Sequence, residues 1–356
     1  MSEFSYVHQI RIGNEGEVFR RLGVDARGGA RVVRVFLRAV NLFDLNDEQP
    51  GYWEAVDRCL ELCNAAGFYV NFVIFCDAQN MTKEQKRAFL DKVLARYNTH
   101  PGIIWALANE WYQNGFSSYT ELFEFADVMA SVLGHRDFII SDARDGDDPD
   151  ASEETKEETD EIANHCNIVV LHSSRKGGAT PEPSRLRRWV DHLEGFYDVL
   201  QHVGGGVFGY HEEPMGHASQ QWVPLPNGKT YEREYNLDCA IAGAFTSLCA
   251  ELAYCYHRVS EQDDGTPGLD IIGDVLNKIN FTFDPAFRYL NDSWPGSPSR
   301  GFTWRGGKVR HLVNGVEGIT LAYGSEKGTV SWANGYAPID TLYDGAQCTL
   351  WKVRKG

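Results

Sequence analysis

Glutamate side chains follow two short apolar runs of the sequence, in the segments GIIWALANEW and GGGVFGYHEEPMG. Glu110 comes directly after Asn109 in the first segment, and Glu212 and Glu213 come directly after His211 in the second. Two carboxyl groups held about 5–5.5 Å apart can cleave a glycosidic bond with retention, because one protonates the leaving oxygen while the other attacks the anomeric carbon. Mutual repulsion and unequal surroundings keep two such carboxyls in different protonation states.

Further polar residues also follow apolar runs, which would gather them at the carboxyl-terminal edge of a parallel barrel. They are Asp25, Arg34, Arg38, Asp77, Asp142, His172 and His257. A metal-dependent hydrolase using His172, His211 and His257 with Asp77 or Asp142 is therefore an alternative. Against this alternative, the first predicted strand contains no HxH pair and the sequence contains no HExxH motif. We expect no metal and no other cofactor.

The positioning elements follow from the alternation of short apolar runs with longer helical patterns, which is typical of a parallel sheet covered by helices. The predicted strands are Val18–Val24, Arg31–Leu37, Phe68–Phe75, Ile103–Ala108, Phe138–Ser141, Ile168–Leu171, Val207–His211 and Leu252–Tyr256. Their near-continuous apolarity fits strands buried on both faces. The predicted helices cover Tyr52–Ala66, the run after Thr82, the run after Ser117 and Ser118, Ser184–Val203 and Tyr231–Ala250.

This pattern predicts an α/β fold, a (β/α)₈ TIM barrel whose first βα unit is shortened. Only residues 25–30 separate the first two predicted strands. A parallel crossover needs about a dozen residues. Either the first helix of the barrel is absent, or a longer loop is missing from this segment.

The texture changes after about residue 290, where SWPGSPSRG forms a connector. The strand-like runs GFTW, KVRHLV, GITLAY, GTVSWA and CTLWKV follow, separated by glycine-rich turns. We therefore predict two domains: a catalytic barrel over residues 1–290 and a small antiparallel β-sandwich over residues 291–356. Because so short a sandwich is marginal alone, it should dock on the barrel.

On these residues the chain resembles the clan of (β/α)₈ retaining glycoside hydrolases that includes cellulases and mannanases. Asn109-Glu110, the glutamates of HEEPMG, the strand VVRVF and the opening HQIRIGNEGEVFRRLGVDA carry the resemblance, which covers about residues 8–290. It implies that Glu110 is the general acid/base, that Asn109 binds the substrate 2-hydroxyl and that Arg34 orients the nucleophile. Glu213 is the preferred nucleophile, since Pro214 ends the strand after it, and Glu212 is the alternative.

Aromatic and histidine side chains at or beyond strand ends are candidates for substrate contacts. Tyr210 and Trp222 could stack on sugar faces, as could Trp111 and Tyr112. His172 and His257 are either substrate-binding or core histidines. A rim position is the alternative for Trp222, which lies in the polar loop HASQQWVPLPNGK.

Charge and composition narrow the partners. Lys plus Arg is 34 and Asp plus Glu is 50, so the net charge is 34 − 50 = −16. Such a surface disfavours nucleic acid and anionic lipid. We expect an oligo- or polysaccharide substrate, with neutral glycans favoured because Asp142–Glu161 is strongly acidic. Eight cysteines without a CxxC pair, and an N-terminus without a signal pattern, favour a cytoplasmic, reducing compartment. A carbohydrate-binding pseudoenzyme is the remaining alternative.

Overall fold

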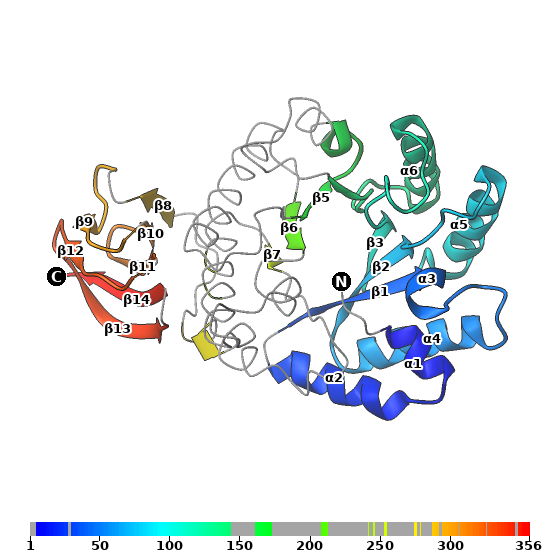
Figure 1. The fold of residues 1–356 in the computed structure, drawn as a ribbon, viewed down its shortest axis with the longest axis horizontal. Helices are drawn as coiled ribbons and strands as arrows, with labels where there is room; N and C mark the ends of the chain where they lie inside the picture. Colours follow the sequence, from blue (N-terminus) through cyan, green and yellow to red (C-terminus); the bar gives the residue numbers. More distant parts are fainter. Residues whose placement is uncertain are drawn as a thin grey trace, which may run out of the picture.

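The computed structural model describes residues 5–27, 30–143, 161–172, 208–212, 287–291 and 294–356 except 306, 325, 346 and 347, together with 241, 245, 253–254, 274–275 and 278. Parallel strands with outer helices form one part of the described chain, and an antiparallel sheet forms the other (Figure 1). No helix within these ranges is both long and apolar enough to cross a membrane.

The chain opens with two helices, α1 (Tyr6–Arg11) and α2 (Glu15–Arg27). The predicted first strand, Val18–Val24, is therefore wrong, because these residues lie within α2. Buried Val18 and Leu22 recur at a spacing of four, which is the helical period, and Glu17 pairs with Arg21 one turn on. Residues 25–27 form the last turn of α2, and the first strand begins at Val32, so the predicted shortened βα unit is also wrong.

The strands β1 (Val32–Arg38), β2 (Tyr69–Phe75) and β3 (Ile103–Ala108) form a parallel sheet in sequence order. Its ladder continues through residues 139–143. The Leu107 amide donates to the Ile139 carbonyl oxygen, and the Ile139 amide donates to the Trp105 carbonyl oxygen. This segment ends in β4 (Asp142–Ala143), which pairs in parallel with β5 (Ile168–His172), followed by β6 (Phe208–Glu212) and β7 (Ala253–Tyr254). Sequential parallel strands of this kind are those of a βα barrel.

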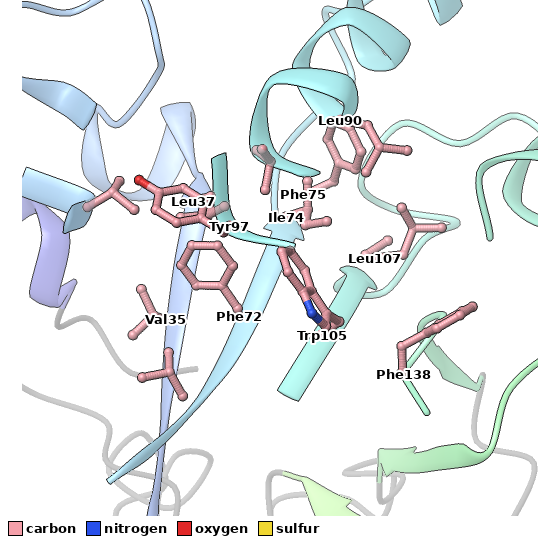
Figure 2. Packing of buried hydrophobic residues seen from close by; sticks show 14 of the residues in the cluster. Val35, Leu37, Phe72, Ile74, Phe75, Leu90, Tyr97, Trp105, Leu107 and Phe138 are labelled. Carbon is pink, nitrogen blue, oxygen red and sulfur yellow. The ribbon is translucent and has the colours of Figure 1, made fainter. Parts of the chain in front are cut away.

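Both faces of the strands are buried, as predicted for a parallel sheet. One face contacts the helices through residues such as Val35, Phe72 and Trp105, and Phe72 lies against both Tyr97 and Trp105 (Figure 2). The alternate residues of the same strands, among them Phe36, Val73 and Ala106, form a second cluster on the opposite face. The strand register pairs Phe36 with Val73 and Val73 with Ala106, so the three lie at the same level and this cluster fills the side that faces away from the helices.

Three long helices cover the outer face: α4 (Tyr52–Ala65), α5 (Lys83–Tyr97) and α6 (Tyr119–Leu133). The predicted helix starts after Thr82 and after Ser118 are confirmed. Thr82 and Gln85 form a capping box on α5, and Ser118 accepts a hydrogen bond from the Glu121 amide on α6. A short helix, α3 (Val40–Phe43), follows β1. Five cysteines of the described chain are buried and form no disulfide: Cys59, Cys63, Cys76, Cys166 and Cys348.

The C-terminal part contains a five-stranded antiparallel sheet in the order β13-β14-β11-β10-β8 and a two-stranded sheet of β12 and β9. The strands are β8 (Arg288–Asn291), β9 (Ser299–Phe302), β10 (Lys308–Val313), β11 (Glu317–Tyr323), β12 (Val330–Trp332), β13 (Tyr336–Asp344) and β14 (Cys348–Lys355). Strands β8 and β13 were not predicted. β13 has mostly exposed side chains and contains Pro338, which the edge of a sheet tolerates. β8 straddles the predicted domain boundary at residue 290.

A buried histidine in this sheet predicts a pH-dependent stability. His311 has no exposed surface, and its ring nitrogens lie 2.9 Å from Ser299 Oγ and 2.8 Å from Thr320 Oγ1. Burial, with the charge of Arg310, lowers the pKa of His311 to about 3 from 6.5. Between about pH 6.5 and pH 3, His311 binds a proton in the unfolded chain but not in the folded chain. The free energy of unfolding therefore falls as the pH drops through this range, by about 1.4 kcal/mol per pH unit.

We therefore expect the opening free energy of β10 and β11, measured by hydrogen exchange, to fall between pH 6.5 and pH 5 by about 2 kcal/mol more in the wild type than in His311→Gln. His135→Gln is the control, because His135 is exposed. Parallel pH profiles for the wild type and His311→Gln would contradict the assignment.

Candidate active site

The first group of predicted site residues comes together between β1 and the end of β3, with Arg34 within β1 rather than at its predicted end. Arg34 of β1 donates from Nη2 to Asn109 Oδ1 over 2.9 Å, although the two residues lie 75 positions apart in the chain. Between them on β2, Asn71 is paired in register with Arg34 and is 3% exposed. The Arg34 guanidinium also lies 4.9 Å from the centre of the Phe36 ring. The structure thus brings Arg34 and Asn109 into direct contact.

The backbone of Asn109 is fixed by a hydrogen bond to β2, and one donor of its side chain is available for a ligand. Its amide donates to the Phe75 carbonyl oxygen over 2.9 Å, which continues the β2–β3 ladder by one residue. The side chain is 1% exposed, and its Nδ2 has no hydrogen-bond partner within the described part of the chain. A buried amide donor without a partner is costly, so this group is suited to bind a ligand oxygen.

Glu110 adopts a backbone conformation that non-glycine residues rarely take. Its φ is +39°, in the left-handed region, and it is 9% exposed. Such a conformation costs of order 1–3 kcal/mol and persists only where the surroundings impose it, frequently at functional sites. The Glu110 carbonyl oxygen accepts hydrogen bonds from the amides of Gln113 and Asn114, which closes a tight turn directly after the strand.

The loop between β3 and α6, residues 109–118, is tied down along its length. Asn114 Nδ2 donates to the Asn109 carbonyl over 2.6 Å, and the Asn114 carbonyl accepts from the Ala78 amide. Gly115 has a φ of +99°, and a Cβ there would lie 2.4 Å from the Ala78 carbonyl carbon, so only glycine fits. Phe116 packs between Phe75 and Phe125, at ring distances of 5.6 and 5.5 Å. The loop therefore holds Glu110 in a fixed place.

A buried ion pair lies beneath this loop. Lys86 of α5 and Glu121 of α6 are 3% and 7% exposed and form a salt bridge. Lys86 Nζ also donates to the Gly115 carbonyl over 2.7 Å, and Glu121 Oε2 accepts from the amide and hydroxyl of Ser117. Burial would raise the pKa of Glu121, but the hydrogen bonds from Lys86 and Ser117 hold that pKa below its ordinary value.

Four residues of this region were not predicted from the sequence: Asn71, Asn114, Lys86 and Glu121. A signal was present for the ion pair, because Lys86 occupies the apolar stripe of α5 with Leu90 and Val93, and Glu121 occupies that of α6 with Phe125. A charged residue on a core-facing stripe indicates a buried partner. No comparable pattern in the sequence marked the two asparagines.

Two other predicted residues have structural partners. Asp77 is 5% exposed and accepts a hydrogen bond from the Asn41 amide over 2.6 Å, which fixes α3 after β1. Arg38 pairs with Asp47. Trp111 is 4% exposed and packs on Tyr119 at 4.6 Å, so it is a core residue rather than a surface for sugar stacking. Tyr112, next to it, is half-buried.

The second group of predicted residues is described only by its backbone or not at all. His172 and Glu212 are partners in register at the ends of β5 and β6, and Tyr210 lies two residues earlier on β6. Their side chains, and the whole of Glu213, Trp222 and His257, lie outside the described residues. Counting along the sheet, β6 lies three strands beyond β3, with the 139–143 segment and β5 between. That separation is the one predicted between the two glutamate-bearing strands.

The described residues contain no group of three or more His, Cys, Asp or Glu side chains that could hold a metal ion. The side chains of the three histidines in the metal-dependent alternative are outside these residues, as is His257 altogether. That alternative therefore stays a hypothesis that metal analysis of the purified protein can test.

No protein-family model matches the sequence, and no curated protein matches it. Among solved structures, a glycoside hydrolase matches with a TM-score of 0.61 and 12% identity, covering 96% of this chain and 89% of its own. A glycoside hydrolase of family 5 from Bacteroides vulgatus matches with a TM-score of 0.59 and 14% identity, covering 96% and 86%. A family 30 endoxylanase from Clostridium papyrosolvens matches with a TM-score of 0.50 and 9% identity, covering 95% and 92%.

These structures have the TIM-barrel fold of the glycoside hydrolase clan that the sequence resembles, and the likeness extends over most of the chain. The fold is therefore that of a family 5 or family 30 glycoside hydrolase. The identities are too low for the comparison to assign catalytic residues or a substrate.

Proposed function

We propose that this chain is a retaining glycoside hydrolase that cleaves β-linked glycans with Glu110 as general acid/base and Glu213 as nucleophile. One observation carries the proposal: Asn109 and Glu110 end a parallel strand, and Arg34 reaches Asn109 from β1. A hydrogen-bonded Arg-Asn pair beside a carboxyl group on a strained turn is an arrangement for binding and cleaving a polar substrate. The fold shared with glycoside hydrolases supports the carbohydrate as that substrate.

The reaction proceeds by two displacements. In the first, the Glu110 carboxyl protonates the glycosidic oxygen as its bond to the anomeric carbon breaks, and the Glu213 carboxylate forms an ester with that carbon. In the second, Glu110, now a carboxylate, takes a proton from water while the water oxygen displaces Glu213. Asn109 Nδ2, buried and without a partner in the described chain, would donate to the 2-hydroxyl. This contact strengthens in the oxocarbenium-like transition state.

The structure removes the main reason for proposing a carbohydrate-binding pseudoenzyme. The pseudoenzyme hypothesis assumed that a truncated first βα unit had cost the activity, but the residues predicted as its strand, Val18–Val24, lie within α2. Turnover decides between the two functions. The wild type should hydrolyse aryl β-glycosides, and Glu110→Gln should not match it on unactivated glycans. Glu124→Gln, which alters a half-exposed carboxylate on α6, should act like the wild type.

We expect neutral β-linked glucans or mannans, or cationic amino sugars, to be better substrates than polyuronates. Asp142–Glu161 holds eleven acidic residues against Arg144 and Lys156, and it directly follows the strand segment beside β3. A negative field focused in a cleft repels polyanions. A hydrolysis panel of glucans, mannans, chitosan, pectin and alginate tests this expectation. If pectin or alginate proved the best substrate, the charge argument would be wrong.

A further inference from the structure

The Lys86–Glu121 pair has no explanation in helix packing alone. Two charges in a core lose their hydration, and an apolar pair of similar size stabilises a protein as well or better. Yet both side chains are more than nine-tenths buried, between α5, α6 and the loop that carries Glu110. The pair makes its remaining hydrogen bonds to that loop: Lys86 to the Gly115 carbonyl, and Glu121 to Ser117.

These contacts lead to Glu110 in few steps. Gly115, which Lys86 holds, directly follows Asn114 in the chain. Asn114 donates from its side chain to the Asn109 carbonyl and from its amide to the Glu110 carbonyl. Below the loop, the Phe116 ring lies 4.7 Å from Lys86 Nζ and is itself fixed by Phe75 and Phe125. The ion pair and Phe116 therefore brace the turn on which Glu110 takes its left-handed conformation.

We propose that Lys86 and Glu121 are positioning residues for general acid catalysis: their buried ion pair fixes residues 110–116, so that the Glu110 carboxyl points at the leaving oxygen. This inference rests on the proposed function of Glu110. It concerns two residues that contact neither the Glu110 side chain nor, by their burial, a substrate. A misplacement of about 1 Å can cost on the order of 10²-fold in rate, so a slackened turn should lower turnover without weakening binding.

The chain offers a matched control pair. Lys83 and Glu124 lie one turn away on the same helices, α5 and α6, and also form a salt bridge. Both are about half exposed, at 52% and 51%, and no hydrogen bond within the described residues joins them to the 109–118 loop. Losing this pair removes a link between the two helices while leaving the turn in place.

The experiment compares Lys86→Met, Glu121→Gln and their double variant with Lys83→Met, using aryl β-glycosides with good and poor leaving groups. With poor leaving groups, we expect kcat of the first three variants to fall about 10- to 100-fold while KM stays within about twofold. With a dinitrophenyl leaving group, which hardly needs protonation, kcat/KM, which reports only the first displacement, should fall by less than about threefold. The double variant should be no worse than the poorer single variant, because both residues act through one pair. Lys83→Met should match the wild type.

A second measurement does not depend on activity. Hydrogen exchange of the Gln113 and Asn114 amides, which donate to the Glu110 carbonyl, should be faster in Lys86→Met and in Glu121→Gln but unchanged in Lys83→Met. Val93→Ala, a cavity variant elsewhere on α5, controls for a general loss of stability. If Lys86→Met fails to fold, Glu121→Gln keeps the lysine and carries the test.

Outcomes separate the inference from the proposed function. Equal losses of kcat/KM on both leaving-group classes, unchanged kinetics, or the same leaving-group dependence in Val93→Ala would overturn the positioning role while Glu110→Gln still shows the acid/base signature. If Glu110→Gln itself lacks that signature, or the wild type cleaves no glycoside, the proposed function fails and the inference fails with it.

Discussion

Glu110→Gln is expected to lower turnover on unactivated β-glycans by about 10²–10⁴-fold, which is the range for losing a general acid. The loss should be much smaller on aryl glycosides with good leaving groups, because departure of such a group hardly needs a proton. For those substrates, hydrolysis of the glycosyl-enzyme becomes limiting, since the general base is also missing. Steady-state kinetics on a series of aryl glycosides measures both effects.

Azide provides the control for this prediction. It needs no general base, so it should attack the glycosyl-enzyme of Glu110→Gln, restore turnover and yield a β-glycosyl azide. The wild type should gain nothing. An equal loss on all leaving groups, without rescue by azide, would contradict the role of Glu110. Unchanged thermal unfolding of the variant is required, because Glu110 is buried on a strained turn.

Glu213→Ala is expected to abolish turnover on every substrate, since no ester can form without the nucleophile. In the wild type, a 2-fluoro glycoside with a good leaving group should trap that ester. The fluorine slows both displacements, but the good leaving group compensates only for the first, so the ester accumulates. Mass mapping of the labelled peptide should place the sugar on Glu213.

The neighbouring carboxylate makes this result decisive. Glu212 ends β6 in register with His172 of β5, and it is the alternative nucleophile. A label on Glu212 would shift the assignment by one residue and leave the mechanism in place. Inactivation of Glu212→Ala alone, with the label on Glu212, would establish the same shift. Labelling of neither glutamate by a glycoside that the enzyme cleaves would contradict both.

Much of the barrel could be predicted because its strands and helices agree with their local patterns. The apolar run before Asn109 predicted β3 with its observed bounds, and Thr82 and Ser118 marked the starts of α5 and α6. The region Val18–Val24 was wrongly predicted as a strand because it is a short segment with several apolar residues. The charges of α2, which pair at helical spacing through Glu17 and Arg21, are the feature that decides for a helix.

The position of a candidate residue could be predicted where that residue follows a strand. It could not be predicted where the conformation of a loop determines the position. Asn109 and Glu110 followed from the strand pattern, and their contact with Arg34 follows from two parallel strands separated by one. The left-handed Glu110, the Asn114 contacts and the buried Lys86–Glu121 pair depend on how the loop folds back on Ala78. Strand β13 escaped prediction for a related reason: an exposed edge strand has no apolar alternation to read.

The configuration of the first product tests the central claim most directly. Proton NMR of the wild type cleaving an aryl β-glycoside, recorded before mutarotation, distinguishes the two anomers as they form. Two glutamates close enough for direct attack leave no room for water in the first step, so the β-anomer must appear first. Early accumulation of the β-anomer is the result we predict. Early accumulation of the α-anomer would show single displacement by water and contradict the double-displacement mechanism.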